Sequence, residues 1–177
     1  MAAQVASAAI AGPTSNIVVI TQTLMLPAGM AVPETGVVFN NGMSYFSTDP
    51  KDVNFVEAGQ RPRFVMSPTI VTRHGQPFFA LGSAGGWTIP QTILQVIVRA
   101  LDFQMDAHDA VKAPRFVLQY LEKGFTDPTR AALGEKRNRL LDAKDGYGML
   151  NGIMIYPRTN VLSGGADGRR EGHVAAW

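Results

Sequence analysis

The sequence predicts an α+β fold with antiparallel sheets, a single domain over residues 1–177, on three observations. Strand-like runs come in neighbouring pairs separated by short turns, which is the pattern of antiparallel hairpins. One long apolar helical segment lies mid-chain, and strands and helices do not alternate as they do in parallel βαβ folds. The 177 residues suffice for one core, and 46% are hydrophobic against 17% charged. So few charges also predict surface that a partner covers.

The first half of the chain predicts two hairpins. The first is expected over Ala3–Leu24, where two strand-like runs flank the turn "PTS". A further strand is expected in "TGVVFNN" at residues 35–41, and the polar stretch Asp49–Arg63, broken by Gly and Pro, is expected to be an exposed loop. The second hairpin forms where "PTIVTR" and "QPFFALGS" flank His74 and Gly75.

The segment Thr88–Phe103 predicts a helix that starts at Thr88 or Ile89, with Pro90 in its first turn. Its polar residues form one narrow stripe at helical spacing, so most of its surface is expected to be buried. The residues of that stripe are Gln91, Gln95, Arg99 and Asp102.

The last third mixes short helices and strands. A helix capped by Asp106 and Asp109 is expected in "MDAHDAVKAP", then a strand in "RFVLQYL". "TDPTRAALGEKRNRLLDAKDG" predicts an exposed charged helix capped by Asp127, and "GIMIYP" with "TNVLSGG" a final hairpin. Arg115 is expected to tie neighbouring elements together, and "GGADGRR" to form a structural turn with salt bridges.

Several classes of function are disfavoured. A net charge of +2 without a block of Lys or Arg argues against nucleic acid, and no apolar run is long enough to cross a membrane. The absence of cysteine excludes disulfides and thiolate chemistry, and the three histidines show no metal-ligand spacing, so neither metal nor cofactor is expected. The opening residues lack the positive charge of a signal peptide, which leaves a periplasmic or a cytoplasmic location open.

The stretch "FALGSAGGWTIP" places Gly85 and Gly86 between a strand and a helix. Paired glycines there have two uses. They form a tight turn, or they expose two backbone N–H groups to a negatively charged ligand.

Six stretches, in order and spanning roughly residues 16–170, resemble the small subunit of gamma-glutamyltransferases and related acylases of the N-terminal-nucleophile hydrolase superfamily. They are "NIVVITQTL", "TGVVFNNGM", "RPRFVMSPTIV", "LGSAGG", "ILQVIVRALDFQMDAHDAVKAPRF" and "GGADGRR". The resemblance implies half of an αββα sandwich, which a larger companion chain from the same precursor completes. It also implies a small-molecule amide or acyl substrate.

In that family the precursor cleaves itself, and the new N-terminal Thr of the small subunit attacks an amide carbonyl with its own α-amino group as the base. By resemblance, the N–H groups of Gly85 and Gly86 hold the oxyanion. Thr23 matches the second-strand Thr that hydrogen-bonds the nucleophile; ordinary strand packing is its alternative role.

No Thr occupies the nucleophile position. Facing residues of an antiparallel hairpin have a constant index sum, and a turn centred near residue 13 puts one of residues 2–4 opposite Thr23. Ala2 is the predicted vacant position, since removal of Met1 would leave it as the N-terminus with an amine and no hydroxyl. Counting back along the motif without gaps gives Val5 instead.

The side chains that recognise a free amino-acid head group in the family are replaced by apolar, aromatic or absent ones. A buried zwitterion without partners costs several kcal/mol, so a bulkier and less polar acyl group is expected; interface or core packing is the alternative role. Arg63 is either a partner for a substrate carboxylate or a solvated loop residue. The candidate substrate-binding positions are Met25, Asn41, Gly42, Tyr45, Phe64, Val65 and Trp87.

Two functions follow. The chain is the small subunit of an amide-cleaving or acyl-transferring enzyme, or it is a catalytically inactive member of the same fold that binds or assembles without turnover. The vacant nucleophile position favours the second, whereas the glycine pair and Thr23 favour the first. A third reading is a dimer of this chain in place of the companion. Thr14, in the turn, is a rival nucleophile but lies roughly 30 Å from Thr23 along the strand.

Overall fold

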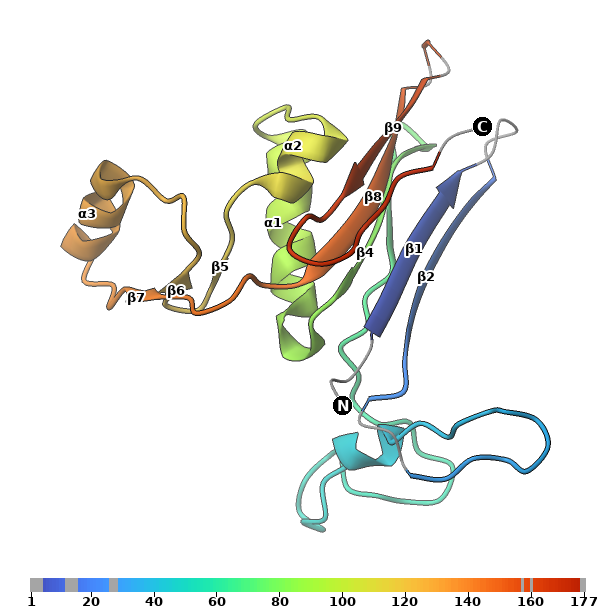
Figure 1. Ribbon diagram of the computed structural model, residues 1–177. Coiled ribbons are helices and arrows are strands. Elements are labelled where there is room, and N and C mark those ends of the chain that lie inside the picture. Colours follow the sequence, from blue (N-terminus) through green and yellow to red (C-terminus); the bar gives the residue numbers. More distant parts are fainter. Residues whose placement is uncertain (1–4, 12–15, 26–28, 157, 160, 176–177) are drawn as a thin grey trace.

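The computed structural model describes residues 5–11, 16–25, 29–156, 158–159 and 161–175, and they form three sheets and three α-helices (Figure 1). The main sheet has four antiparallel strands in the order β3-β4-β8-β9. Its strands are β3 Thr69–Arg73, β4 Gln76–Ala84, β8 Met149–Tyr156 and β9 Val161–Ala166. A separate hairpin pairs β1 Val5–Ala11 with β2 Ile17–Thr23.

The helices are α1 Ile89–Leu101, α2 Ala107–Lys112 and α3 Asp127–Glu135, and two 3₁₀ helices are η1 Gly42–Tyr45 and η2 Gly86–Thr88. A small third sheet contains β5 Phe116–Val117, β6 Tyr120–Leu121 and β7 Leu141–Asp142. It lies with α3 to one side of the main sheet (Figure 1).

The main sheet is covered on both faces. Helices α1 and α2 pack on one face, and the β1–β2 hairpin packs on the other against β4 and β8 (Figure 1). Because β4 lies between these layers, its residues 79–84 are all buried, on both faces of the strand. The described residues thus supply the order helix, sheet, sheet, which is three of the four layers of an αββα sandwich.

The core lies between α1, α2 and the main sheet. Phe79 and Leu81 of β4 and Leu150 and Met154 of β8 meet the buried face of α1. Helix α2 can lie directly on β9 because Gly165 has no side chain, since a Cβ there would sit 2.2 Å from the carbonyl oxygen of Ala107. Packing of the apolar face of α1 on the sheet, more than the helix propensity of its residues, therefore holds the helical layer in place.

Most predicted elements are confirmed: the three hairpins, the central helix with Thr88 before it, and the short helix α2, whose cap Asp106 accepts a hydrogen bond from the Asp109 N–H at 2.8 Å. The predicted burial of α1 on most sides is wrong for this chain alone. Leu94 is 61% exposed, so the apolar stripe is wider than the described residues cover.

Three predicted elements differ. "TGVVFNN" forms no strand, because its only ladder contact among the described residues is the bridge between Ala31 and Val38. "RFVLQYL" forms β5 and β6 rather than one strand, since Leu118 takes a positive φ of 53° and turns the chain back.

The predicted charged helix is shorter than expected and is capped by another residue. It ends at Glu135 because Arg137 takes a φ of 61° and closes the last turn on the Gly134 carbonyl. Its cap is Thr126, whose hydroxyl accepts from the Thr129 N–H, whereas Asp127 is the first helical residue.

Candidate active site

The β4–α1 junction carries two consecutive glycines in the left-handed region. Gly85 has φ 136° and Gly86 has φ 57°. At Gly85 only glycine fits, because a Cβ would lie 2.6 Å from the Thr88 hydroxyl oxygen and 3.0 Å from the Gly148 Cα. The Gly85 carbonyl accepts from both the N–H and the hydroxyl of Thr88, which fixes the turn.

The N–H groups of Gly85 and Gly86 lie beyond the end of β4 and donate no hydrogen bond to another described residue. Successive free N–H groups in such a turn form a concavity that binds anions. The junction therefore has the donors that a tetrahedral oxyanion needs.

The register of the β1–β2 hairpin corrects the expected pairing. Thr23 faces Val5, not one of residues 2–4. The pairing is symmetric about residue 14, one position beyond the centre assumed from the sequence, so every partner shifts accordingly. Val5 is the position given by the ungapped count, and it carries no hydroxyl; Ala2 lies outside the described residues.

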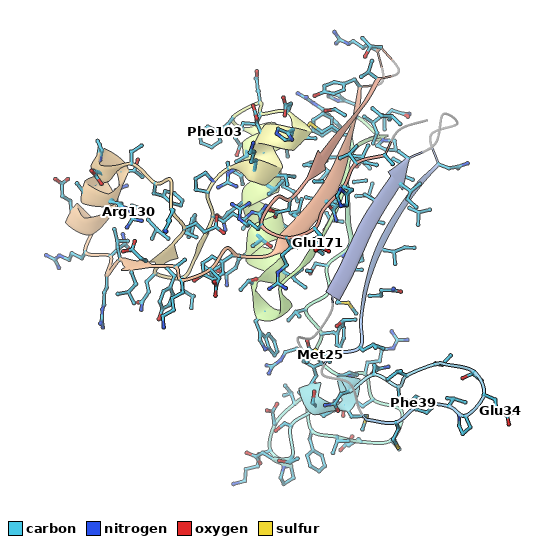
Figure 2. The ribbon with its side chains drawn as sticks, viewed as in Figure 1. Met25, Glu34, Phe39, Phe103, Arg130 and Glu171 are labelled. Atoms are coloured by element: carbon cyan, nitrogen blue, oxygen red, sulfur yellow. The ribbon has the colours of Figure 1, made fainter. Side chains whose placement is uncertain are left out.

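The hydroxyl of Thr23 is held at the end of β2, where it accepts a hydrogen bond from the Met25 N–H at 2.9 Å. Met25 takes a φ of 58°, so the chain turns sharply there. Met25 packs against the core cluster that contains Ile89, at the same end of the sheets as the start of α1 and of β1 (Figures 1 and 2). Thr23, Val5 and the glycine junction thus share one end of the molecule.

Three predicted substrate residues form an aromatic cluster, defined as Tyr45, Phe64 and Trp87. The Tyr45 ring centroid lies 4.6 Å from that of Phe64 and 5.4 Å from that of Trp87, both edge-to-face. Arg63 lies over the Trp87 ring at 5.7 Å. Tyr45 is buried, and burial raises the pKa of its hydroxyl, whereas Phe64 and Trp87 remain 39% and 59% exposed.

Asn54 links the segments around Tyr45 and Arg63 by hydrogen bonds. Its side chain is buried, donates to the Tyr45 carbonyl at 2.6 Å and accepts from the Arg63 N–H at 2.8 Å. No pattern in the sequence marks this residue, because it lies in a polar loop without periodicity, for which the sequence predicts exposure throughout. Its buried amide makes the long connection between β2 and β3 a defined structure.

The remaining predicted substrate positions have structural contacts. Asn41 donates its N–H to the Leu24 carbonyl at 3.0 Å and precedes η1, so it ties the cluster to the end of β2. The Gly42 N–H donates to the Asn40 side chain at 2.8 Å. Val65 is buried in the core cluster and lines no open surface.

A buried network of four charges joins α2, the third sheet and β9. Arg115 is fully buried and pairs with Asp167 at 2.6 Å, and Arg169 contacts Glu122 at 2.5 Å and Asp167 at 3.0 Å. Burial alone would raise the pKa of both carboxyls, but the arginines and backbone N–H groups outweigh it and hold each pKa below its usual range. The structural role expected for Arg115 and "GGADGRR" is therefore confirmed.

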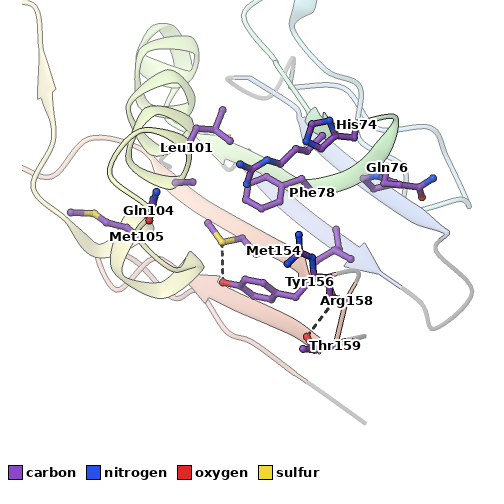
Figure 3. Close-up of a pocket in the computed structure, with 14 residues that line it drawn as sticks. His74, Gln76, Phe78, Leu101, Gln104, Met105, Met154, Tyr156, Arg158 and Thr159 are labelled. Carbon is purple, nitrogen blue, oxygen red and sulfur yellow. Dashed lines mark hydrogen bonds between the residues drawn. The ribbon is translucent and has the colours of Figure 1, made fainter.

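A hollow lies at the opposite end of the main sheet. It has a volume of about 760 Å³, and its lining includes Arg73 as well as Phe78, Met154 and Arg158 (Figure 3). None of the predicted catalytic or substrate positions lines it. Backbone geometry, and not the size of a cavity, therefore identifies the glycine junction as the candidate site.

Two absences bear on the chemistry. Within the described ranges, no three His, Asp or Glu side chains lie close enough together to hold a metal ion. Among those same residues, no helix has the length and apolar character needed to cross a membrane.

The chain is similar to known proteins over nearly its whole length. The profile of the family described as gamma-glutamyltranspeptidase matches residues 3–177. The glutathione hydrolase proenzyme of Escherichia coli is 34% identical over 172 residues, covering 87% of this chain and 29% of that protein. The chain therefore spans less than a third of the length of that relative.

Solved structures give the same picture. The T380A mutant of Helicobacter pylori gamma-glutamyltranspeptidase superimposes with a TM-score of 0.84 at 31% identity, covering 93% of this chain and 99% of that one. A cephalosporin acylase from Bacillus halodurans gives a TM-score of 0.82 at 30% identity, covering 91% of this chain and 32% of that one.

Proposed function

The chain belongs to the gamma-glutamyltranspeptidase family, and from that premise we propose that it is the small-subunit part of an amide hydrolase or acyltransferase. The observation that carries the proposal is the β4–α1 junction, where the N–H groups of Gly85 and Gly86 donate to no described residue and only glycine fits at position 85. Two of its relatives are named proenzymes and are about three and a half times as long as the matched region. A larger companion chain therefore completes the fold.

The chemistry follows from the geometry once a hydroxyl stands opposite Thr23. The hydroxyl oxygen attacks the amide carbonyl carbon, its proton passes to the free α-amino group, and the carbonyl oxygen takes the negative charge beside the two glycine N–H groups. Collapse breaks the C–N bond, and the leaving amine takes the proton. Water or a second amine then cleaves the acyl ester and regenerates the hydroxyl.

A second candidate function is binding of the same ligands without turnover. It is favoured by the pairing of Thr23 with Val5, which has no hydroxyl to activate. Ala2, the position predicted from the sequence, has none either. In this reading the glycine junction and the aromatic cluster retain a ligand site from which the nucleophile is absent.

The experiment restores the nucleophile at each candidate position. One variant starts at residue 5 with Val5→Thr, so that the new Thr carries a free amine, and the other starts at residue 2 with Ala2→Thr. Each is co-expressed with the family's larger subunit from the same organism and assayed with γ-glutamyl, hexanoyl and phenylacetyl p-nitroanilides. The Val5→Thr complex is expected to release p-nitroaniline, while Ala2→Thr stays at background like the unmodified chain.

Two other outcomes would change this interpretation. Release by the Ala2→Thr complex alone would show that the register misplaces the nucleophile. A correctly assembled Val5→Thr complex that cleaves none of the three amides would remove the enzymatic proposal and leave the binding function.

A further inference from the structure

We propose that the aromatic cluster selects a flat aromatic acyl group and excludes a free amino-acid head group. This inference rests on the proposed function, since it names the ligand class of the same site. It starts from chain position: Trp87 directly follows Gly86, so its ring and the two free N–H groups belong to one turn. An acyl carbonyl held by those N–H groups therefore has its acyl substituent beside Trp87.

The cluster offers apolar ring surface where a substrate can reach it. Tyr45 lies behind the other two rings and holds each edge-to-face, with interplanar angles of 61° and 71°. Phe64 and Trp87 keep exposed ring surface. A third ring from a ligand can extend this edge-to-face arrangement, and an aromatic ring gains more from it than an alkyl chain of equal area.

The cluster is built before any ligand arrives. Asn54 joins the Tyr45 carbonyl to the Arg63 N–H, and Asn41 joins η1 to the end of β2. Arg63 in turn lies over the Trp87 ring. Rings fixed in this way lose little conformational entropy on binding, so they discriminate between ligand shapes.

The charge at the cluster disfavours the ammonium group of an α-amino acid. Among the described residues, the only charged side chain in ring contact with the cluster is Arg63, whose guanidinium has no ion-pair partner there. A ligand ammonium group placed beside it would meet a like charge. Met25, Phe64 and Val65 provide no oxygen on their side chains to accept hydrogen bonds from that ammonium group.

The test measures binding of acyl products to the full chain, which needs no nucleophile. The chain has two tryptophans, so a Trp177→Phe background leaves Trp87 as the sole indole reporter. Phenylacetate is expected to change the Trp87 emission saturably, hexanoate to bind at least tenfold more weakly, and L-glutamate to have no effect at the same concentrations.

Matched variants locate the effect. Phe64→Ala is expected to weaken phenylacetate binding about tenfold, and Arg63→Met to weaken it less, because Arg63 positions the indole rather than contacting the ligand. Phe103→Ala removes an equally large, exposed ring from the chain after α1 and is expected to change nothing.

Two results would overturn the inference: hexanoate or L-glutamate binding as tightly as phenylacetate, or no ligand altering the Trp87 emission. The proposed function is judged separately. A threonine-restored complex that cleaves the hexanoyl or γ-glutamyl amide faster than the phenylacetyl amide refutes this inference and supports amide cleavage. Phenylacetate binding without any turnover supports this inference and refutes amide cleavage.

Discussion

Replacing Arg115 by methionine is expected to lower the free energy of unfolding by about 3–5 kcal/mol. The guanidinium is fully buried, pairs with Asp167 at 2.6 Å and donates to the carbonyls of Tyr147 and Val111. Methionine occupies the site but, among the described residues, leaves the Asp167 carboxylate with only Arg169 as a charge partner. It also removes the guanidinium donor of the Tyr147 carbonyl, whereas the Val111 carbonyl keeps its bond from Arg169. Urea denaturation followed by circular dichroism measures the loss.

Two further variants make the result interpretable. Arg115→Lys keeps the positive charge but not the planar guanidinium that binds several acceptors at once. It is therefore expected to lower the free energy of unfolding less than Arg115→Met does. It can also be measured if Arg115→Met does not fold. Arg130→Met removes an ion pair of similar length, 2.9 Å, but its partner Asp142 is 82% exposed; its cost is expected to stay below about 1 kcal/mol. Equal losses for Arg115→Met and Arg130→Met would contradict the account of the buried network.

In the threonine-restored complex, Gly85→Ala is expected to lower kcat about 100- to 1000-fold. The added methyl would meet the Thr88 hydroxyl at 2.6 Å and the Gly148 Cα at 3.0 Å, and the second of these is backbone that cannot rotate away. The junction must therefore move, and the two N–H groups are displaced with it. Single-turnover rates with phenylacetyl p-nitroanilide measure the effect.

Gly86→Ala is the matched control, because nothing lies within 4 Å of a Cβ at that position. Its φ of 57° is open to alanine at a cost of about 1–2 kcal/mol in stability, with both N–H groups kept in place. The kcat of Gly86→Ala is expected to stay within about tenfold of its parent. Similar losses of kcat at both positions would argue that backbone strain, rather than displacement of the N–H groups, lowers the rate.

The sequence predicted the elements whose signal is periodic and local. Alternation and paired runs gave the hairpins, and the polar stripe gave α1, because side chains repeat every two residues in a strand and every 3.6 in a helix. The glycine junction was predicted from composition at a strand-to-helix boundary. Both residues there take the positive φ values that glycine permits.

What the sequence missed depends on contacts between distant segments. The register of β1 and β2 depends on how the turn is formed, so an error of one position in its centre displaced the partner of Thr23 to Val5. Asn54 became structural only through Tyr45 and Arg63, nine residues away on either side. "TGVVFNN" has the composition of a strand, but it found only an isolated bridge, and propensity without a ladder does not make a strand.

We propose that the Gly85 and Gly86 N–H groups, the end of β2 and the aromatic cluster form one ligand site. An NMR titration of the ¹⁵N-labelled chain with phenylacetate tests it most directly. The amides of Gly85, Gly86 and Met25 and the Trp87 indole N–H are expected to shift together with one dissociation constant. Shifts confined to residues around the hollow of Arg73 and Arg158, with both glycine amides unmoved, would contradict it.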